Sequence, residues 1–220
     1  MKVKLVGYTQ PDSGFIGLED VQDVITYCAK VSNPLGQMNS ESSTRLLTYL
    51  IKHQHWSPFE MASATMEVET TRDIARQFLR HRSFSFQEFS QRYANPVDME
   101  KGFELREARL QDPKNRQNSI PVDDRELKLL WSIKQTMVIN AAKEAYEWAL
   151  NNNIAKEQAR AVLPEGNTVS RLYVNGTIRS WIHYIELRSA NGTQLEHIEL
   201  AKACAAAITK IFPMIKDLTK

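Results

Sequence analysis

Residues 80–93 hold the densest group of side chains that could do chemistry. They include three arginines, Arg80, Arg82 and Arg92, and no lysine, together with serine hydroxyls such as those of Ser85 and Ser90. A guanidinium presents a rigid fork of N–H groups that matches two oxygens of a phosphate, and hydroxyls and loop N–H groups can complete such a cradle. Because each charge-assisted hydrogen bond contributes roughly 1.5–3 kcal/mol, two or three would hold a nucleotide phosphate. The alternative is a solvated basic helix end with the phenylalanines of this segment packed under it.

A helix predicted over residues 71–79 leads into this segment. Arg72, Arg76 and Arg80 follow one another at intervals of four, with apolar residues between them. That spacing gives the helix one apolar face and one face lined by guanidinium groups. The sequence therefore predicts a binding site for anionic, phosphate-bearing ligands organised around Arg72 to Arg92.

Two other groups of polar residues have weaker patterns. Residues 53–60 place two histidines and a glutamate at a proline-enforced turn, but no further metal ligand follows at suitable spacing, so hydrogen-bonding loop histidines are favoured. Arg160 ends one predicted helix nearer the C-terminus. Arg179, His183 and Arg188 lie on or beside the next helix, at intervals of four and five that keep them roughly on one side. On spacing alone these four are ordinary surface charges.

Several motifs of nucleotide-binding and hydrolytic enzymes are absent from the sequence. It contains no GxGxxG dinucleotide turn, no GxxxxGKS/T phosphate loop and no GxSxG nucleophile turn. Its two cysteines, Cys28 and Cys204, lie far apart in apolar, helix-like stretches, and we expect both to be small buried thiols. Without a CxxC pair, a thiol-rich metal site or redox motif is excluded.

The elements that must position these residues can be read from hydrophobic periodicity. Strands are predicted over 2–8, 61–70 and 169–174, with a weaker one at 103–110, and helices over 19–32, 42–53, 123–150, 177–187 and 194–211, plus a short helix ending at 163. The apolar stripe of the long helix comprises Leu127, Leu130, Trp131, Met137, Val138, Ala141, Ala145 and Trp148. Few strands among many helices favour an α+β fold with one mainly antiparallel sheet flanked by several helices. One domain over residues 1–220 is the expected organisation.

The composition of the chain limits the classes of partner that it can bind. With 42% hydrophobic and 25% charged residues, the chain can bury a core without disulfides. A net charge of +2 is too small for nucleic-acid binding by bulk counterion release. No apolar run reaches the roughly 18 residues that span a bilayer, and the N-terminus lacks a signal peptide's apolar stretch. We therefore expect a cytoplasmic protein with no nucleic-acid or membrane partner.

One motif carries a family resemblance. Arg80, His81 and Arg82, then seven residues, then Ser90 match the RHRx7S signature, so the chain resembles the flavin-dependent thymidylate synthases. The continuation through Tyr93, the segment HxHxSPFE at 53–60, ARAVLP at 159–164 and the pair Leu187-Arg188 are also similar to that family. The resemblance covers roughly residues 30–93 and 157–197, whereas 97–152 matches only as a generic helical insert.

The resemblance implies an activity. Members of the family make dTMP from dUMP by reductive methylation, taking the carbon from 5,10-methylenetetrahydrofolate and the hydride from tightly bound FAD that NADPH reduces. It implies a homotetramer with active sites at subunit interfaces, and no cysteine nucleophile. The last point agrees with the sequence, because neither cysteine has a neighbouring base or cation to make a thiolate.

The resemblance also implies functional residues. The catalytic residue would be Arg188, which polarises the uracil ring and favours ionisation at N3. The implied dUMP contacts are Gln77, Arg80, Glu88, Phe89, Ser90, Gln91, Arg92, Arg160 and Arg188. The implied FAD contacts are Ser32, Ser57, Glu60, Arg80, His81, Arg82, Glu88, Arg179 and His183. The chain departs from the family at 189–192, where members often carry a histidine, and at 165–176, where it needs a one-residue insertion against some members.

Two rival functions use the same residues. A single-strand-binding module would stack bases on Phe84, Phe86 and Phe89 beside the arginines. A helical oligomer scaffold would carry the arginines as an incidental anion site. The first predicts a steep salt dependence of affinity for oligonucleotides, and the second predicts that replacing Arg188 changes nothing measurable.

Overall fold

The computed structural model describes residues 1–39 and 43–218, and its centre is one antiparallel sheet. The sheet has four strands in the order β1 (Lys2–Tyr8), β2 (Ser63–Thr71), β6 (Val169–Thr177) and β3 (Phe84–Glu88). The two inner strands pair along nine residues each, from Ser63 opposite Thr177 to Thr71 opposite Val169. Three of these strands were predicted, and the α+β class is confirmed. The edge strand β3 lies inside the arginine-rich segment and was not predicted.

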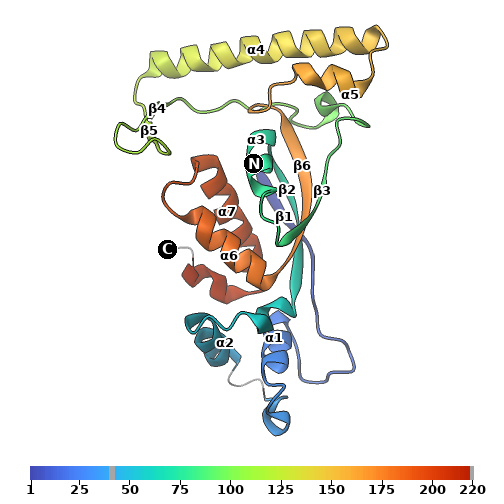
Figure 1. Cartoon of the computed structure of the whole chain (residues 1–220), viewed down its shortest axis with the longest axis vertical. Coiled ribbons are helices and arrows are strands. Elements are labelled where there is room, and N and C mark those ends of the chain that lie inside the picture. Colours follow the sequence, from blue (N-terminus) through green and yellow to red (C-terminus); the bar gives the residue numbers. More distant parts are fainter. Residues whose placement is uncertain (40–42, 219–220) are drawn as a thin grey trace.

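Seven α-helices are described, and most match the predicted ranges. They are α1 (Val21–Ala29), α2 (Ser43–Lys52), α3 (Arg72–Phe78), α4 (Arg125–Asn151), α5 (Lys156–Ala159), α6 (Ile178–Ser189) and α7 (Leu195–Ile208). Short 3-10 turns include η1 (Pro34–Gly36), η2 (Ser57–Glu60), η3 (Pro96–Asp98), η4 (Arg160–Val162) and η5 (Pro213–Leu218). Residue 42, the expected start of the second helix, lies outside the described residues. In Figure 1, α6 and α7 lie beside the sheet, α1 and α2 lie at one end of the molecule, and α4 crosses the other end.

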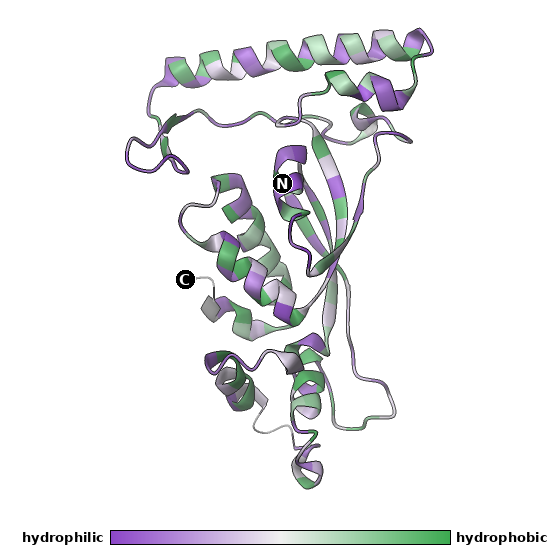
Figure 2. Cartoon of the chain, viewed as in Figure 1, coloured by the Kyte–Doolittle hydropathy of each residue, from purple (hydrophilic) through white to green (hydrophobic). Residues whose placement is uncertain are grey.

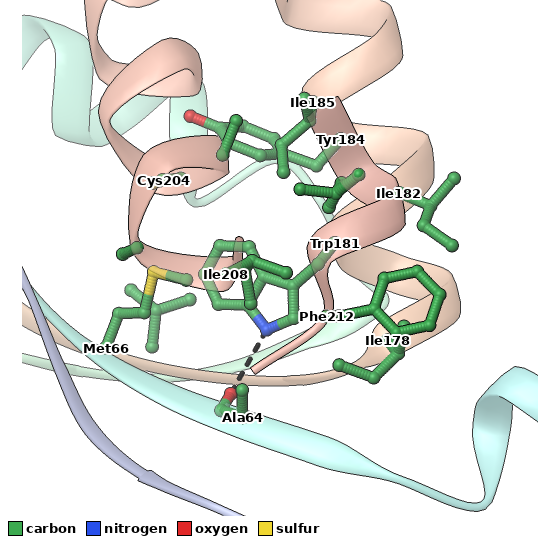
Figure 3. Packing of buried hydrophobic residues seen from close by; sticks show 14 of the residues in the cluster. Ala64, Met66, Ile178, Trp181, Ile182, Tyr184, Ile185, Cys204, Ile208 and Phe212 are labelled. Carbon is green, nitrogen blue, oxygen red and sulfur yellow. Dashed lines mark hydrogen bonds between the residues drawn. The ribbon is translucent and has the colours of Figure 1, made fainter. Parts of the chain in front are cut away.

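The core lies between the sheet and the helices α6 and α7. Ala64, Met66 and Val68 alternate along β2 with their side chains fully buried. The indole of Trp181 packs against this face and donates its Nε1–H to the carbonyl of Ala64 at 3.1 Å, as Figure 3 shows. Ile182 and Ile185 are likewise buried, so the prediction that these α6 residues belong to the core is confirmed. The indole hydrogen bond matters because a buried N–H without a partner would destabilise the fold.

The apolar stripe predicted for α4 does not face the core. The helix buries instead Gln135, Ile139, Ala142, Tyr146 and Ala149. The predicted stripe is largely exposed, at Leu127, Leu130, Trp131, Met137, Val138, Ala141 and Trp148, while Ala145 is half-buried. Figure 2 shows hydrophobic and hydrophilic residues mixed along the whole helix. The prediction failed because α4 carries apolar residues on more than one face and its own chain covers only one of them.

The segment between β3 and α4 is mostly irregular. The strand predicted over 103–110 is wrong apart from its end, because the structure has only β4 (Arg109–Gln111), which pairs with β5 (Ser119–Pro121) as a small hairpin. Phe103 instead forms a single bridge with Thr168. None of the described helices is both long and apolar enough to cross a membrane.

Candidate functional site

The Arg80-His81-Arg82 triplet occupies a tight turn between α3 and β3. The N–H of His81 donates to the carbonyl of Phe78 at 2.9 Å, and the N–H of Phe84 donates to the carbonyl of His81 at 3.2 Å. Both phenylalanines are buried, so the turn is anchored at each end. Arg80 and Arg82 are exposed and make no hydrogen bond or ion pair with any residue in the described part of the chain. Their guanidinium forks are therefore available to a ligand.

A close approach of two strands fixes this turn from behind. Phe84 lies opposite Gly176 on β6, and a Cβ at that glycine would lie 2.4 Å from Cδ1 of the Phe84 ring. Only a residue without a side chain lets the ring cross the strand at this point. The ring then packs at 4.6 Å from Trp181 and 5.6 Å from Phe78, between ring centroids. Phe84 is thus a core residue, which contradicts its suggested use as a base-stacking platform.

Arg188, at the end of α6, reaches the same turn. Its Nε–H donates to Nε2 of His81 at 2.9 Å. Burial, followed by the charges of Arg188 and Arg80, lowers the pKa of His81 to about 4. The imidazole is therefore neutral at pH 7 and can accept this hydrogen bond. The bond uses one of the five N–H groups of the guanidinium, and the terminal nitrogens remain for a ligand.

Gln77 joins this group from α3, next to a buried histidine. Its amide oxygen lies 3.1 Å from Nδ1 of His197, and its amide nitrogen donates to Gln194 at 2.8 Å. The rings of His197 and His81 have centroids 6.4 Å apart. Three of the predicted dUMP contacts, Gln77, Arg80 and Arg188, therefore lie together at the turn that holds the triplet. We call this cluster, with His81, the triplet cluster.

A second group lies at the other end of β3. Glu88 accepts from Ser170 at 2.9 Å and from Arg72 at 3.4 Å. Beyond the strand, Arg92 pairs with the carboxylate of Glu157 at 3.3 Å, and Nε of Arg160 donates to the backbone carbonyl of Glu157, also at 3.3 Å. The structure thus joins the loop at 88–92 to Arg160, although some 70 residues separate them in the sequence.

One atom of this second group lacks a partner. Gln91 is 4% exposed, and its amide nitrogen is buried without a hydrogen-bond partner among the described residues. An unpaired buried donor costs free energy, so such atoms call for an acceptor. A carbonyl or phosphate oxygen of a ligand would supply one. We call residues 88–92 with Arg160 the loop cluster.

A third group surrounds η2 near α1. The guanidinium of Arg179 pairs with the carboxylate of Glu60, and the ring of His183 stands edge-on to Trp56 at 4.6 Å between centroids. Burial is the main cause that lowers the pKa of His183, followed by the charge of Arg179. Ser57 lines a hollow of about 510 Å³ with Tyr27, Cys28, Ala29, Val31, Gln37, Pro58 and Met61. Ser32 is exposed just after α1. We call Ser32, Ser57, Glu60, Arg179 and His183 the η2 cluster.

The structure corrects the expectation about the arginines of α3. Nε of Arg76 donates to Glu165 at 2.9 Å, and Arg72 is 7% exposed and lies 3.4 Å from both Glu88 and Glu165. Of the three, only Arg80, which follows the end of the helix, has no partner among the described residues. The fold brings the two carboxylates to the helix from the end of β3, for Glu88, and from the loop before β6, for Glu165, and helical spacing could not reveal these pairings.

Two smaller expectations also change. Arg179 and His183 contact η2 whereas Arg188 contacts the triplet turn, so the three do not share one side of α6.

The two cysteines differ in burial. Cys204 is buried, and burial raises the pKa of its thiol, but Cys28 is half-buried and lines the hollow beside Ser57. Among the loop histidines, Nδ1 of His53 lies 2.9 Å from the carbonyl of Tyr49, as a hydrogen-bonding role predicts. No group of three potential metal ligands occurs within residues 1–39 and 43–218.

Sequence reasoning missed the polar residues at the start of α7. Gln194 and His197 contact Gln77, whereas Glu196 accepts a hydrogen bond from Gln194 and pairs with Arg106 and Arg109 from the irregular segment. A signal was present, because these polar residues open a helix that is otherwise rich in alanine. The helix buries Glu196 and His197 almost completely.

Comparison with known proteins places the chain in a family. The family model described as thymidylate synthase complementing protein matches residues 16–214. A probable flavin-dependent thymidylate synthase of Paramecium bursaria Chlorella virus 1 is 47% identical over 215 residues, which are 98% of this chain and 97% of the relative. A flavin-dependent thymidylate synthase of Synechocystis sp. is 44% identical over 216 residues, again 98% and 97% of the two chains.

A solved structure agrees with this placement. A UMP/dUMP methylase, PolB, from Streptomyces cacaoi, crystallised with 5-Br dUMP, superposes with a TM-score of 0.77 at 26% identity, covering 99% of this chain and 93% of that one. The triplet turn and Arg188, which pairs with it from α6, fit the same family as these matches over almost the whole chain. The chain belongs to the family of the flavin-dependent thymidylate synthases.

Proposed function

We propose that this protein is a flavin-dependent thymidylate synthase that converts dUMP to dTMP by reductive methylation. The family membership supports this activity, and so does the likeness to a methylase crystallised with a dUMP analogue. The observation that carries the proposal is the triplet cluster, where Arg80 and Arg82 lie on one turn without a partner among the described residues and Arg188 reaches that turn from α6. The carbon donor would be 5,10-methylenetetrahydrofolate, and the reductant would be NADPH. A cytoplasmic location is part of the proposal.

In this proposal Arg188 is the catalytic residue. Its Nε is committed to His81, so the guanidinium is held in place before the substrate arrives. A fixed cation beside a uracil carbonyl and N3 stabilises the negative charge that makes C5 nucleophilic. Because the neutral imidazole of His81 only accepts from Arg188, it restrains the cation without neutralising it. This electrostatic activation needs no covalent enzyme nucleophile.

The cysteines are poorly placed for covalent catalysis. Cys204 is buried in α7, and burial raises the pKa of its thiol, so a thiolate is disfavoured. Cys28 lies on α1, in the η2 cluster's hollow rather than at the triplet turn. Both observations support a mechanism in which uracil is activated by charge.

The proposed dUMP contacts divide between two of the clusters. Gln77, Arg80 and Arg188 come from the triplet cluster, whereas Glu88, Phe89, Ser90, Gln91, Arg92 and Arg160 come from the loop cluster. The five residues 83–87, most of them in β3, separate Arg82 from Glu88, and an extended strand rises about 3.3 Å per residue, so the separation along the chain is roughly 17 Å. One small nucleotide would not bridge that span within a single chain.

This separation supports an active site shared between copies of the chain. If the loop cluster of one subunit faced the triplet cluster of another, a single dUMP could contact both. The exposed apolar residues of α4 give a surface that a neighbouring subunit could cover, because large unpaired apolar surfaces mark interaction sites. We therefore propose a homotetramer with its sites at the subunit interfaces.

The donor chemistry of the remaining residues fits FAD. The unpaired guanidinium groups of Arg80 and Arg82 suit a pyrophosphate. His81 and Glu88, with Ser32, Ser57, Glu60, Arg179 and His183 of the η2 cluster, complete the proposed FAD contacts. When bound, FAD reduced by NADPH would supply the hydride. The protein's own part is to hold its phosphates and orient it toward the nucleotide.

The decisive experiment starts from the purified protein. We expect flavin absorbance bands, NADPH oxidation that depends on dUMP, and dTMP formation when 5,10-methylenetetrahydrofolate is added. Chromatographic detection of dTMP distinguishes methylation from a simple oxidase reaction. A colourless protein that FAD cannot reconstitute would exclude the proposed activity.

A further inference from the structure

A continuous chain of hydrogen bonds runs from α6 through α7 to α3. The hydroxyl of Tyr184 lies 3.1 Å from Nε2 of His197, and Nδ1 of that ring lies 3.1 Å from the amide oxygen of Gln77. The amide nitrogen of Gln77 donates to Gln194 at 2.8 Å, whose own amide nitrogen donates to Glu196 at 2.9 Å. Every internal member of this relay can both donate and accept.

The carboxylate at one end sets the direction of the whole relay. Ionised Glu196 can only accept, so Gln194 must present its amide nitrogen to it and its amide oxygen to Gln77. Gln77 must then present its own nitrogen to Gln194, which turns its oxygen toward His197. That oxygen can only accept, so Nδ1 of His197 must carry the proton. The bare Nε2 then accepts from the hydroxyl of Tyr184.

The surroundings keep two members of the relay, Glu196 and His197, in the protonation state that this direction requires. Burial alone would raise the pKa of Glu196, but hydrogen bonds, including those from Gln194 and Arg109, and the charge of Arg106 produce a net lowering. Burial, followed by the charges of Arg188 and His81, lowers the pKa of His197 to about 3. The carboxylate is thus ionised and the imidazole neutral at pH 7.

We propose that Glu196, Gln194 and His197 are positioning residues that fix the amide polarity of Gln77. With the relay in place, Gln77 keeps one amide N–H and one oxygen lone pair free, each in a set direction. This inference rests on the proposed function, which makes Gln77 a contact of dUMP. A uracil edge presents carbonyl acceptors and an N–H donor, so a reversed amide would oppose like groups. The polarity of one side chain therefore selects the orientation of the base.

The tautomer of His197 is a direct measure of the relay's direction. In protein labelled with 15N in its histidine rings, we expect Nδ1 to be protonated and Nε2 bare at pH 7.5, with the resonances assigned from their loss in His197→Asn. Glu196→Gln supplies an amide that can point either way, so a population with Nε2 protonated should appear. A native His197 protonated at Nε2, or a tautomer unchanged by Glu196→Gln, would overturn the proposal.

A kinetic comparison tests the effect on the substrate. The amide nitrogen of asparagine can replace the Nδ1–H of histidine, whereas leucine cannot donate. We expect His197→Leu to raise KM for dUMP about tenfold, with a smaller change in kcat and unchanged flavin absorbance, and His197→Asn to restore most of the loss. Thr209→Val, at the end of the same helix, is the matched control and should leave KM unchanged. Equal KM values for the leucine and asparagine variants would contradict the positioning role.

The two readouts separate this inference from the activity it rests on. The tautomer is measured without turnover, so it remains informative if no dTMP is formed and also if His197→Leu fails to fold. If dTMP is formed but the relay has the opposite direction, only the positioning inference fails. If the relay has the expected direction but dUMP is not a substrate, the proposed function fails.

Discussion

Arg188 and His81 are joined by a hydrogen bond of 2.9 Å between two nitrogen atoms, with Nε of the arginine donating to Nε2 of the histidine. The bond connects the end of α6 to the turn between α3 and β3. A protonated imidazole could not accept it, so it requires the neutral histidine that burial and the neighbouring cations produce. The pair therefore fixes a cation without cancelling its charge.

Replacing Arg188 should separate catalysis from cofactor binding. We expect Arg188→Ala to retain the fold and the flavin and to lower kcat for dTMP formation by about 10²–10³, the usual effect of removing one electrostatic donor. Flavin absorbance and dTMP yield measure the two properties. Arg45→Ala is the control, because Arg45 is exposed on α2 and belongs to none of the three clusters. Substantial dTMP formation by Arg188→Ala would refute the catalytic assignment.

Arg80 should matter for two ligands at once. It is exposed, without a hydrogen bond or ion pair to the described residues, and it is proposed to contact both dUMP and FAD. We expect Arg80→Ala to weaken each ligand by about 10- to 100-fold, as the loss of a charge-assisted hydrogen bond implies. Calorimetric titration with dUMP and the flavin content of the purified variant report the two affinities. Unchanged values for both would remove Arg80 from the site.

Gly176 should be needed for flavin binding although it is not proposed to touch the flavin. In Gly176→Ala the new Cβ would overlap the ring of Phe84, which anchors the triplet turn. We expect a destabilisation of about 1–3 kcal/mol from overpacking and a lower flavin content. Urea unfolding measures the first effect and absorbance the second. Gly166→Ala is the control, since its Cβ would meet nothing within 4 Å.

Acid should destabilise the fold through two imidazoles, that of half-buried His81 and that of buried His197. His81 and His197 have folded pKa values of about 4 and about 3, below the ordinary 6.5. As the pH falls below about 6.5, the unfolded chain binds protons that the folded chain does not, so the free energy of unfolding decreases. Urea midpoints between pH 7.5 and 5 should show this decline. A double variant with both histidines changed to asparagine should show a flatter profile over the same range.

The outer face of α4 should control assembly. We expect native protein to sediment as a tetramer, and the double variant Met137→Glu, Trp148→Glu to dissociate, because charged groups disfavour burial of that face. Analytical ultracentrifugation gives the mass, and flavin content shows whether the sites survive dissociation. Asn140→Asp is the control, because it adds a negative charge to the same helix without removing an apolar residue. A native protein that sediments as a monomer would contradict the shared-site proposal.

Most of the helices and strands follow from local patterns in the amino-acid sequence. Alternation along β1, β2 and β6 and the periodicity of the helices reflect neighbours within a few residues, so a single sequence reveals them. The arginine-rich segment with its motif identified the family and predicts an anionic ligand. These features are local, and they survived in the structure.

Which of the arginines are available to a ligand depends on contacts between segments that lie far apart in the sequence. Arg72 meets Glu165 across 93 positions, and Arg188 meets His81 across 107, so neither pairing leaves a trace in local spacing. The same holds for β3, whose strand character comes from pairing with β6, and for His197, which is polar yet buried. Charge neutralisation and burial depend on which distant segments meet. Those contacts are set by the packing of the whole chain and, in the proposed assembly, by the packing of the outer face of α4 against a further copy.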